Sequence, residues 1–183
     1  NNSFLATKIS FINQLSNICQ KVSGANIDDI AKTIGLDPRI GKLFLNAGPG
    51  YGGSCLPKDM KALINFADSI GIKPTFLNEV EKTNQKQITN IIYLIEKKIG
   101  SINKKRITVL GTSFKPETDD IRDSMSIKLI KKLLEKGAKV TVHDPKAIEN
   151  TKKIFSDKIE YGKSIIESLT KSQCVIIMTQ WKE

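Results

Sequence analysis

The chain has 183 residues, a formal net charge of +10 at pH 7 and 39% hydrophobic residues. This length fits one domain or two small ones, and the apolar content is enough for a folded core. No apolar run approaches the roughly 20 residues that a membrane span needs, which argues against an integral membrane protein. The positive charge favours an anionic partner. The lysines are scattered and no nucleic-acid-binding motif occurs, so we expect no nucleic acid partner.

The first half of the chain has the periodicity of helices. Apolar residues recur at three- and four-residue steps near the start, which gives one wide apolar face. Gly35 has the position of a helix C-cap, and Pro57 suits the first turn of a helix. Helices are predicted over four segments, 4–19, 26–33, 57–70 and 77–99.

From Arg106 onward the pattern changes to short β-rich runs that alternate with helical ones. Strands are predicted at 107–110, 139–143 and 174–178, with helices at 126–134 and 164–170. Strands that alternate with helices form a parallel, doubly wound sheet. The predicted fold class is therefore α/β overall, with an all-helical central domain over 1–103 followed by a truncated Rossmann-like parallel α/β domain over 104–183.

The three cysteines lie far apart in the sequence, at Cys19, Cys55 and Cys174. They have no CxxC spacing and no histidine cluster beside them, so neither a metal site nor a disulfide framework is expected. Reduced thiols in a cytoplasmic protein are the simplest interpretation. The chain also lacks an initiator Met and a signal peptide, and it begins with residues that look like the inside of a helix. We therefore expect it to be cut from a longer protein.

A glycine-rich loop separates the second and third predicted helices. Its residues Gly48-Pro49-Gly50-Tyr51-Gly52-Gly53 formally satisfy the GxGxxG dinucleotide fingerprint. The strand that must precede such a motif is missing, so this interpretation is weak. A loop whose bare backbone approaches a ligand closely fits better. A glycine-rich turn without function remains the alternative.

Cys55 stands directly after this loop, at the start of a predicted helix. The unpaired N–H groups and positive dipole end of a helix stabilise a thiolate, and Lys58 adds positive charge nearby. Asp59 lies four residues on and returns to the same face of the helix. A thiolate and a carboxylate beside a ligand loop suit covalent catalysis with a general base. The alternative, a cysteine that is simply a small buried apolar residue, fits Cys19 and Cys174 better.

Residues 44–59, which read FLNAGPGYGGSCLPKD, closely resemble the signature of the UDP-glucose/GDP-mannose dehydrogenase family. The agreement covers nearly the whole chain. Residues 4–13 and 35–41 look like parts of the family's central domain. Residues 110–116 with 119–124, and 178–181, resemble parts of its UDP-binding domain.

Members of this family oxidise a sugar CH2OH group to a carboxylate, with NAD as the oxidant, in two hydride-transfer steps. The resemblance implies that Cys55 is the nucleophile, which forms first a thiohemiacetal and then a thioester with the substrate. It implies that Asp59 activates the water that cleaves the thioester, and that Asn2 helps to hold the oxygen that gains negative charge. The expected reaction is oxidation of UDP-glucose to UDP-glucuronate.

The resemblance also implies binding roles. Phe114 and Lys115 would contact the substrate from the second domain, and Arg39 would reach the sugar bound in a partner subunit, which presumes a homodimer through the central helical domain. The residues expected near NAD are Cys55, Lys58 and Arg122. The loop expected to wrap the sugar and diphosphate with backbone N–H groups comprises Asn46, Ala47, Gly48, Pro49, Gly50, Tyr51 and Gly52.

Each exposed charge among these has a structural alternative. Arg39 could cap a helix end, and Lys115 could be ordinary loop surface. Arg122 could pair with one of the neighbouring carboxylates, which are Asp119, Asp120 and Asp123.

Departures from the family pattern limit what the chain can do by itself. The family's NAD-binding domain is absent from it, as is the lysine one helical turn before Asn2, so we predict that this polypeptide alone is inactive and does not bind NAD tightly. Gly53-Ser54 before Cys55 favours UDP-glucose over UDP-N-acetylmannosamine, while GDP-mannose dehydrogenases share much of this loop. A nucleotide-binding or dimerising module without chemistry is the alternative of another class.

Overall fold

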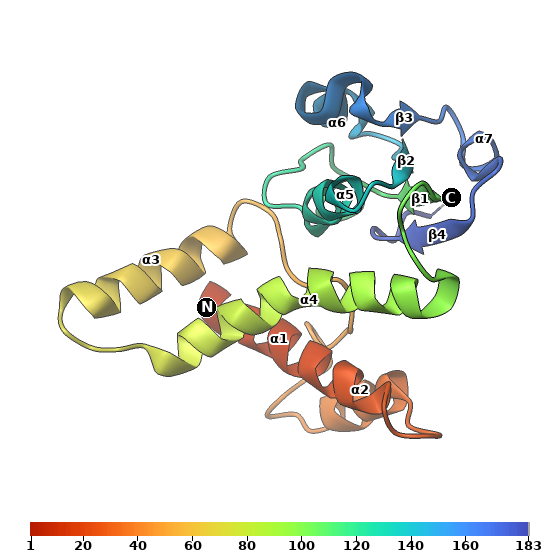
Figure 1. Cartoon of the computed structure of the whole chain (residues 1–183). Helices are drawn as coiled ribbons and strands as arrows, with labels where there is room; N and C mark the ends of the chain where they lie inside the picture. The colour runs from red at the N-terminus through yellow and green to blue at the C-terminus, as the bar shows by residue number, and fades with distance from the viewer. Residues whose placement is uncertain (183) are drawn as a thin grey trace. The chain divides into compact units, whose positions relative to one another are not determined.

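The computed structural model describes residues 1–182, which divide into two compact units at the peptide bond between Gln87 and Ile88 (Figure 1). The first unit is helical, and the second contains a four-stranded parallel sheet. The α/β fold class predicted from the sequence is therefore confirmed.

Helices α1 (Asn2–Cys19), α2 (Ile27–Gly35) and α3 (Leu56–Ser69), with the first part of α4 (Thr75–Ile99), build the first unit. Its core is small and includes Ala6 on α1 and Met60 on α3, both fully buried. Helix α1 therefore packs directly against α3. This packing brings the first turns of the two helices together, which is where the candidate catalytic residues lie.

The ends of these helices follow local sequence signals. The Asn26 side chain caps α2 by accepting a hydrogen bond from the N–H of Asp28. Helix α3 ends in a Schellman motif, in which Gly71 has φ +78° and the N–H of Ile72 donates to the carbonyl of Ala67. The two helix ends lie within one residue of the start and the end predicted for segments 26–33 and 57–70.

Gly35 has a different role from the one predicted. It is the last residue of α2, whose C-cap is Leu36 in a right-handed conformation. A Cβ at Gly35 would lie 3.0 Å from the Cα of Lys42. The glycine therefore permits a close backbone approach and does not cap the helix.

The second unit is a parallel sheet with the strand order β3-β2-β1-β4. The strands are β1 (Arg106–Leu110), β2 (Lys139–His143), β3 (Glu160–Tyr161) and β4 (Cys174–Ile177). The helices between them are α5 (Met125–Glu135), α6 (Ile148–Phe155) with the short 3-10 turn η1 (Ser156–Lys158), and α7 (Ile165–Leu169). The core includes Ile107, Val109, Leu129, Ile130 and Val142, all nearly or fully buried.

Two elements of this unit were not predicted. Helix α6 has eight residues, of which only Thr151 and Phe155 are buried, so its apolar periodicity is weak. Strand β3 has two residues, too few for any alternation to be recognised.

The division between the units falls inside α4, whereas the sequence places the domain boundary between residues 103 and 104. Ile88, Ile92 and Ile95, on the second part of α4, are buried in the core of the second unit. Helix α4 is continuous across this division, so the sequence has no loop signal between Gln87 and Ile88, where the residues of the second core begin.

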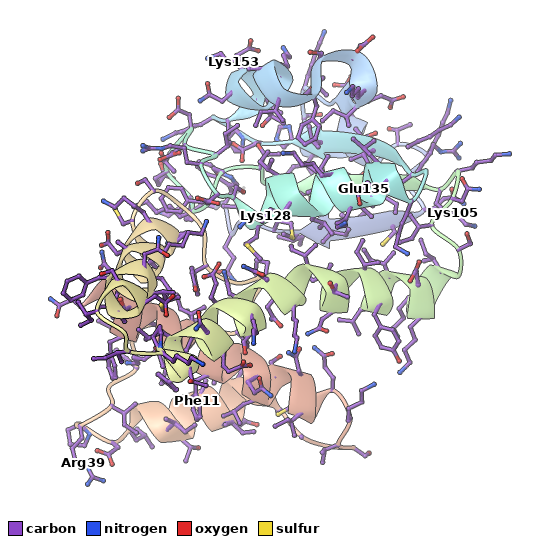
Figure 2. All side chains as sticks on the ribbon, turned by 60° about the vertical axis from the view of Figure 1, so that its left-hand side comes forward. Phe11, Arg39, Lys105, Lys128, Glu135 and Lys153 are labelled. Carbon is purple, nitrogen blue, oxygen red and sulfur yellow. The ribbon has the colours of Figure 1, made fainter. Side chains whose placement is uncertain are left out.

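The basic side chains do not gather in one place. Lys105 and Lys153 lie far apart on the second unit (Figure 2), and many lysines pair with a nearby carboxylate, as Lys152 does with Glu149 at 2.7 Å. None of the helices within residues 1–182 is long and apolar enough to cross a membrane.

Candidate active site

Cys55 occupies the N-cap position of α3 and is exposed. Its Sγ lies 3.6 Å from the Oγ of Ser54. Cys19 and Cys174 are both more buried, and burial raises the pKa of the Cys174 thiol. Of the three thiols, Cys55 therefore has the position that suits a nucleophile: accessible, and at the positive end of a helix.

Asp59 lies one turn further along α3 and is joined to α1. The Nδ2 of Asn2 donates a hydrogen bond to Oδ2 of Asp59 at 2.6 Å, and the Nζ of Lys58 lies 3.4 Å from Oδ1. The hydrogen bond from Asn2, followed by the contact with Lys58, holds the pKa of Asp59 below its usual value. The carboxylate is thus ionised at neutral pH and can accept a proton. Of the three residues predicted as catalytic, Asn2 and Asp59 are bonded to each other across α1 and α3, and Cys55 precedes Asp59 by one turn at the start of α3.

The glycine loop is attached at Gly48 by side-chain amides of α1 and α4. The N–H of Gly48 donates to Oδ1 of Asn13 at 2.8 Å, and the carbonyl of Gly48 accepts from Nε2 of Gln87 at 3.0 Å. Gln87 is itself oriented by Asn17, whose Nδ2 donates to Oε1 at 3.0 Å. Asn13 is fully buried and Gln87 is 6% exposed, whereas Gly48 is exposed, so buried amides hold a loop backbone that stays accessible.

A second attachment holds Tyr51 in the middle of the loop. Its backbone N–H donates to Oδ1 of Asn84 at 2.8 Å, and Nδ2 of Asn84 donates back to the Tyr51 carbonyl at 3.0 Å. The Tyr51 hydroxyl donates to Glu81 at 2.7 Å. With 3% exposure, the Tyr51 side chain anchors the loop in the core. Gly50 and Gly52, on either side, have N–H groups without an acceptor within residues 1–182.

The two arginines singled out in the sequence lie in matching turns. Arg39 pairs with Asp37 at 2.6 Å, and Arg122 pairs with Asp120 at 2.7 Å. In both turns the aspartate, two residues earlier, also accepts the arginine's backbone N–H at 2.9 Å. The guanidinium of each arginine holds the pKa of its aspartate below the usual value. Pairing of Arg122 with Asp120 is one of the alternatives that the sequence left open.

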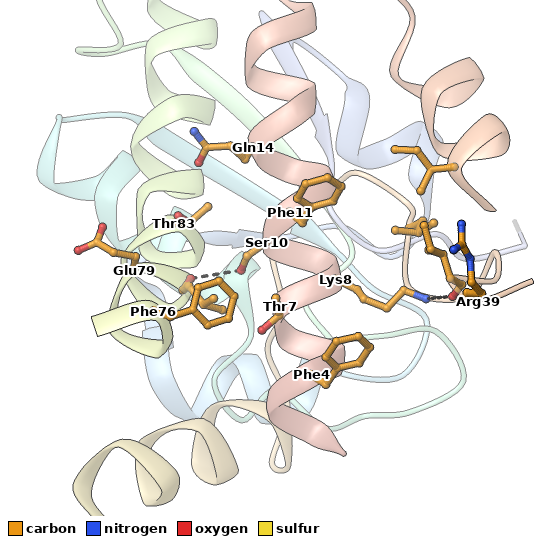
Figure 3. A pocket seen from close by; sticks show the side chains of 14 residues that line it. Phe4, Thr7, Lys8, Ser10, Phe11, Gln14, Arg39, Phe76, Glu79 and Thr83 are labelled. Atoms are coloured by element: carbon orange, nitrogen blue, oxygen red, sulfur yellow. Dashed lines mark hydrogen bonds between the residues drawn. The ribbon is translucent and has the colours of Figure 1, made fainter. Parts of the chain in front are cut away.

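Arg39 lies at the rim of an apolar hollow of about 560 Å³ on the first unit and points outward from it (Figures 2 and 3). The rings of Phe4, Phe11 and Phe76 line this hollow, and all three are at least half exposed. Lys8 supports the rim because its Nζ donates to the carbonyl of Ile40 at 2.9 Å. The hollow does not include Cys55, Asp59 or Asn2, so it is distinct from the catalytic cluster.

In the second unit, Phe114 and Lys115 follow β1 at the carboxyl edge of the sheet. Phe114 is partly buried and Lys115 is exposed, with its Nζ 5.5 Å from the centre of the Phe114 ring. Asn46, Ala47 and Pro49 in the first unit are at least partly accessible. Among residues 1–182 no group of three or more potential metal ligands comes together.

Sequence reasoning did not identify the buried polar residues that hold these segments. Asn13, Asn84, Gln87 and Asp144 are each at most 6% exposed. The one available signal was polar residues on helix faces that are otherwise apolar, as Asn13 is between Ile12 and Leu15.

A helical unit with an exposed cysteine beside an amide-anchored glycine loop, joined in sequence to a parallel nucleotide-binding type of sheet, is the arrangement of nucleotide-sugar dehydrogenases. The sequence profile of the UDP-glucose/GDP-mannose dehydrogenase family, central domain, matches residues 1–86, and that of the same family's UDP binding domain matches residues 108–183. The chain belongs to the UDP-glucose/GDP-mannose dehydrogenase family.

Individual relatives agree with this assignment. The chain is 41% identical over 182 residues to the UDP-glucose 6-dehydrogenase TuaD of Bacillus subtilis, covering 100% of this chain and 39% of the relative. A UDP-glucose dehydrogenase from the hyperthermophilic archaeon Pyrobaculum islandicum superposes with a TM-score of 0.95 at 37% identity, over 98% of this chain and 41% of that one. A GDP-mannose dehydrogenase from Pseudomonas aeruginosa gives 0.69 at 25% identity, over 99% and 43%. The chain thus spans about two-fifths of the length of these proteins.

Proposed function

We propose that this chain is the central and nucleotide-binding part of a dehydrogenase that oxidises UDP-glucose to UDP-glucuronate with two NAD. The observation that carries the proposal is the exposed Cys55 at the start of α3, one turn before Asp59, whose carboxylate accepts a hydrogen bond from Asn2 of α1. The relatives named above support UDP-glucose as the substrate, with GDP-mannose as the alternative sugar nucleotide.

The residues of this chain carry the covalent part of the reaction. The Cys55 thiolate adds to the aldehyde carbon of the half-oxidised sugar, and the aldehyde oxygen becomes the thiohemiacetal oxygen. A carboxamide has two N–H donors, and Asn2 uses one for Asp59, so the other is available to that oxygen. After the second oxidation has given the thioester, Asp59 takes a proton from water, the water oxygen bonds to the carbonyl carbon, and the Cys55 thiolate leaves.

NAD supplies the hydride acceptor for each oxidation. Residues 1–182 do not fit a dinucleotide site. The GxGxxG sequence lies between α2 and α3 with no strand before it, and its Gly48 and Tyr51 are bonded to side-chain amides. Lys58 and Arg122 remain proposed NAD contacts, and both are exposed.

The first unit is further proposed to form a homodimer in the cytoplasm. The apolar hollow with Phe4, Phe11 and Phe76 supports this, because exposed aromatic groups of this kind mark interaction surfaces. Arg39 lies at its rim, as a residue that reaches into a partner's site would. Sedimentation of Phe11→Asp as a monomer, with wild-type protein as a dimer, is the expected result; a wild-type monomer would contradict it.

The deciding experiment counts the NADH formed per sugar by the complete protein, offered UDP-glucose, GDP-mannose and UDP-N-acetylmannosamine separately. We expect two NADH per UDP-glucose. Cys55→Ala should lower turnover by a factor on the order of 10³ or more, since the covalent route is lost. Cys19→Ala and Cys174→Ala are the matched controls and should keep turnover. One NADH per sugar, or an active Cys55→Ala variant, would overturn the proposed mechanism, and turnover only with GDP-mannose would reassign the substrate.

A further inference from the structure

Asp144 is a buried carboxylate at the carboxyl end of β2, with 2% of its surface exposed. Its Oδ2 accepts hydrogen bonds from the backbone N–H of Thr112 at 2.7 Å and of Ser113 at 3.0 Å, and from the Ser113 hydroxyl at 3.0 Å. Its Oδ1 accepts from the N–H of Lys146 at 2.9 Å and of Ala147 at 2.7 Å. One carboxylate therefore connects the segment after β1 to the segment after β2.

Two buried hydroxyl groups, of Ser124 and Thr179, also bind the segment after β1. The carbonyl of Thr112 accepts from Oγ of Ser124 at 2.8 Å, and the carbonyl of Ser113 accepts from Oγ1 of Thr179 at 2.7 Å. The indole N–H of Trp181 reaches Oδ2 of Asp144 at 3.3 Å. The segment after β4 is thereby tied to the segment after β1.

All four backbone N–H groups from residue 111 to residue 114 have an acceptor inside the unit. Besides the two bonds to Asp144, Gly111 donates to the carbonyl of His143 at 2.8 Å and Phe114 donates to the carbonyl of Asp120 at 3.1 Å. In doubly wound nucleotide-binding sheets, the N–H groups after the first strand bind the phosphates of the ligand. Here a carboxylate of the protein itself occupies the position of the anion.

Segment 111–114 therefore has no unpaired backbone N–H for a nucleotide, and its contacts with one come from side chains. Lys115 is exposed and carries the positive charge, and the partly buried Phe114 lies beneath its Nζ. Phe114 and Lys115 come directly after Thr112 and Ser113, whose N–H groups bond to Asp144. The orientation of their two side chains therefore depends on the bonds to Asp144.

We propose that Asp144 is a positioning residue for nucleotide-sugar binding, whose carboxylate replaces a bound phosphate inside segment 111–114 and fixes the placement of Phe114 and Lys115. The inference rests on the proposed function, because it takes these two residues as ligand contacts. It goes beyond that function by assigning the site's geometry to a residue that touches no substrate.

The test measures UDP affinity by calorimetry, together with KM and kcat for UDP-glucose, in the complete protein. Asp144→Asn keeps the size of the side chain but removes one acceptor oxygen. We expect UDP affinity to fall, and KM to rise, by about tenfold, while kcat stays within about threefold, since the cysteine chemistry is untouched. Formate should restore UDP affinity to Asp144→Ala by offering a carboxylate to the same N–H groups.

Leu133→Ala is the matched control, because Leu133 is fully buried in the same core and its side chain has no polar group that could bond to these segments. It should lower the melting temperature without changing UDP affinity. An Asp144→Asn variant with UDP affinity within about twofold of wild type, or no weaker than that of Leu133→Ala, overturns the inference.

The failure of the proposed function has a separate signature. A wild-type protein that binds UDP but does not oxidise UDP-glucose refutes the function alone, and the UDP affinity of Asp144→Asn still decides the role of Asp144. Wild-type protein that binds no UDP overturns both. Amide hydrogen exchange gives a further readout, since Thr112 and Ser113 should lose protection in Asp144→Asn while Tyr51 keeps it.

Discussion

The glycine loop of the first unit and the segment after β1 in the second are both held by buried polar side chains, but by side chains of different kinds. Neutral amides hold the first, through Asn13, Asn84 and Gln87. An ionised carboxylate, Asp144, holds the second. An amide can donate and accept, so Asn84 satisfies both backbone groups of Tyr51. A carboxylate only accepts, so it gathers N–H groups from several residues.

The difference decides what each segment can offer to a ligand. The amides consume one N–H at Gly48 and one at Tyr51, and the N–H groups of Gly50 and Gly52 stay unpaired within residues 1–182. The carboxylate and its neighbours leave no N–H unpaired from residue 111 to residue 114. The first loop can bind an anion with its backbone, whereas the second must use a side chain. Four substitutions would break or sharpen this contrast.

Gly111→Ala should have the largest effect on stability. Gly111 has φ +88°, and a Cβ there would lie 2.5 Å from the Cβ of Thr179 and 2.7 Å from its backbone nitrogen. We expect a loss of roughly 3 kcal/mol in the free energy of unfolding, from backbone strain and overpacking together. Gly24→Ala is the control in chemical denaturation, since φ there is +77° with open space around it. Equal losses in the two variants would show that the close approach to Thr179 does not matter.

Asn84→Leu tests the amide attachment and should cost somewhat less. It leaves the buried N–H and carbonyl of Tyr51 without partners, which we expect to cost about 2 to 3 kcal/mol. Asn65→Leu, on the exposed surface of α3, should stay within about 0.5 kcal/mol of wild type. Unchanged thermal unfolding of Asn84→Leu would mean that water replaces the amide.

Asp144→Asn tests whether the carboxylate attachment, unlike the amide attachment, stabilises the fold in a pH-dependent way. Burial acts to raise the pKa of Asp144, but hydrogen bonds from four backbone N–H groups outweigh it and hold the pKa below its ordinary value of 3.8. A lowered folded-state pKa contributes stability above pH 3.8, and that contribution is lost as the pH falls below 3.8 towards the folded-state value. Lys146, whose backbone N–H bonds to Asp144, pairs through its Nζ with Glu117 at 2.9 Å, and His143 precedes Asp144 in the chain.

We therefore expect Asp144→Asn to cost about 2 kcal/mol at pH 7, with the deficit shrinking below pH 3.8. The deficit of Asn84→Leu should keep the same size across that interval, because amides do not titrate. Parallel denaturant midpoints for the two variants from pH 7 to the acid limit would contradict the distinction.

Gly48→Ala should have the smallest effect on stability and a clear effect on binding. No atom lies within 4 Å of a Cβ placed there, so we expect unfolding free energy within about 0.5 kcal/mol of wild type. A methyl group on the exposed side of the loop should nevertheless raise KM for UDP-glucose by about tenfold if bare backbone faces the ligand. An unchanged KM would favour the interpretation of the loop as a turn without function.

Local signals in the sequence predicted most of the secondary structure. The start of the helix predicted at 26–33, the end of the one at 57–70 and the strand at 139–143 depend only on nearby residues, so their prediction succeeded. The division within α4 could not be predicted, because it depends on which core surrounds Ile88 and Ile92.

The candidate site divides in the same way. Cys55 and Asp59 are one helical turn apart and could be predicted together, whereas the partners of the loop are distant in sequence. Asn13 lies 35 residues before Gly48, and Asp144 lies 32 residues after Thr112. In the sequence, Asn84 looks like a solvent-exposed polar residue of a long helix. Only the structure shows that it is buried and bonded to Tyr51 of the glycine loop.

In the two Asp-x-Arg turns, the positive charges of Arg39 and Arg122 are already paired with the carboxylates of Asp37 and Asp120. Each aspartate occupies the Nε and Nη2 edge of its arginine, so an anion that takes this edge has to displace a carboxylate, and its affinity there is a difference between two ion pairs. Exchange of one exposed pair for another costs little, which leaves selectivity to groups that contact the rest of the ligand. A stray phosphate would gain almost nothing at these arginines, whereas a ligand already anchored elsewhere could recruit them.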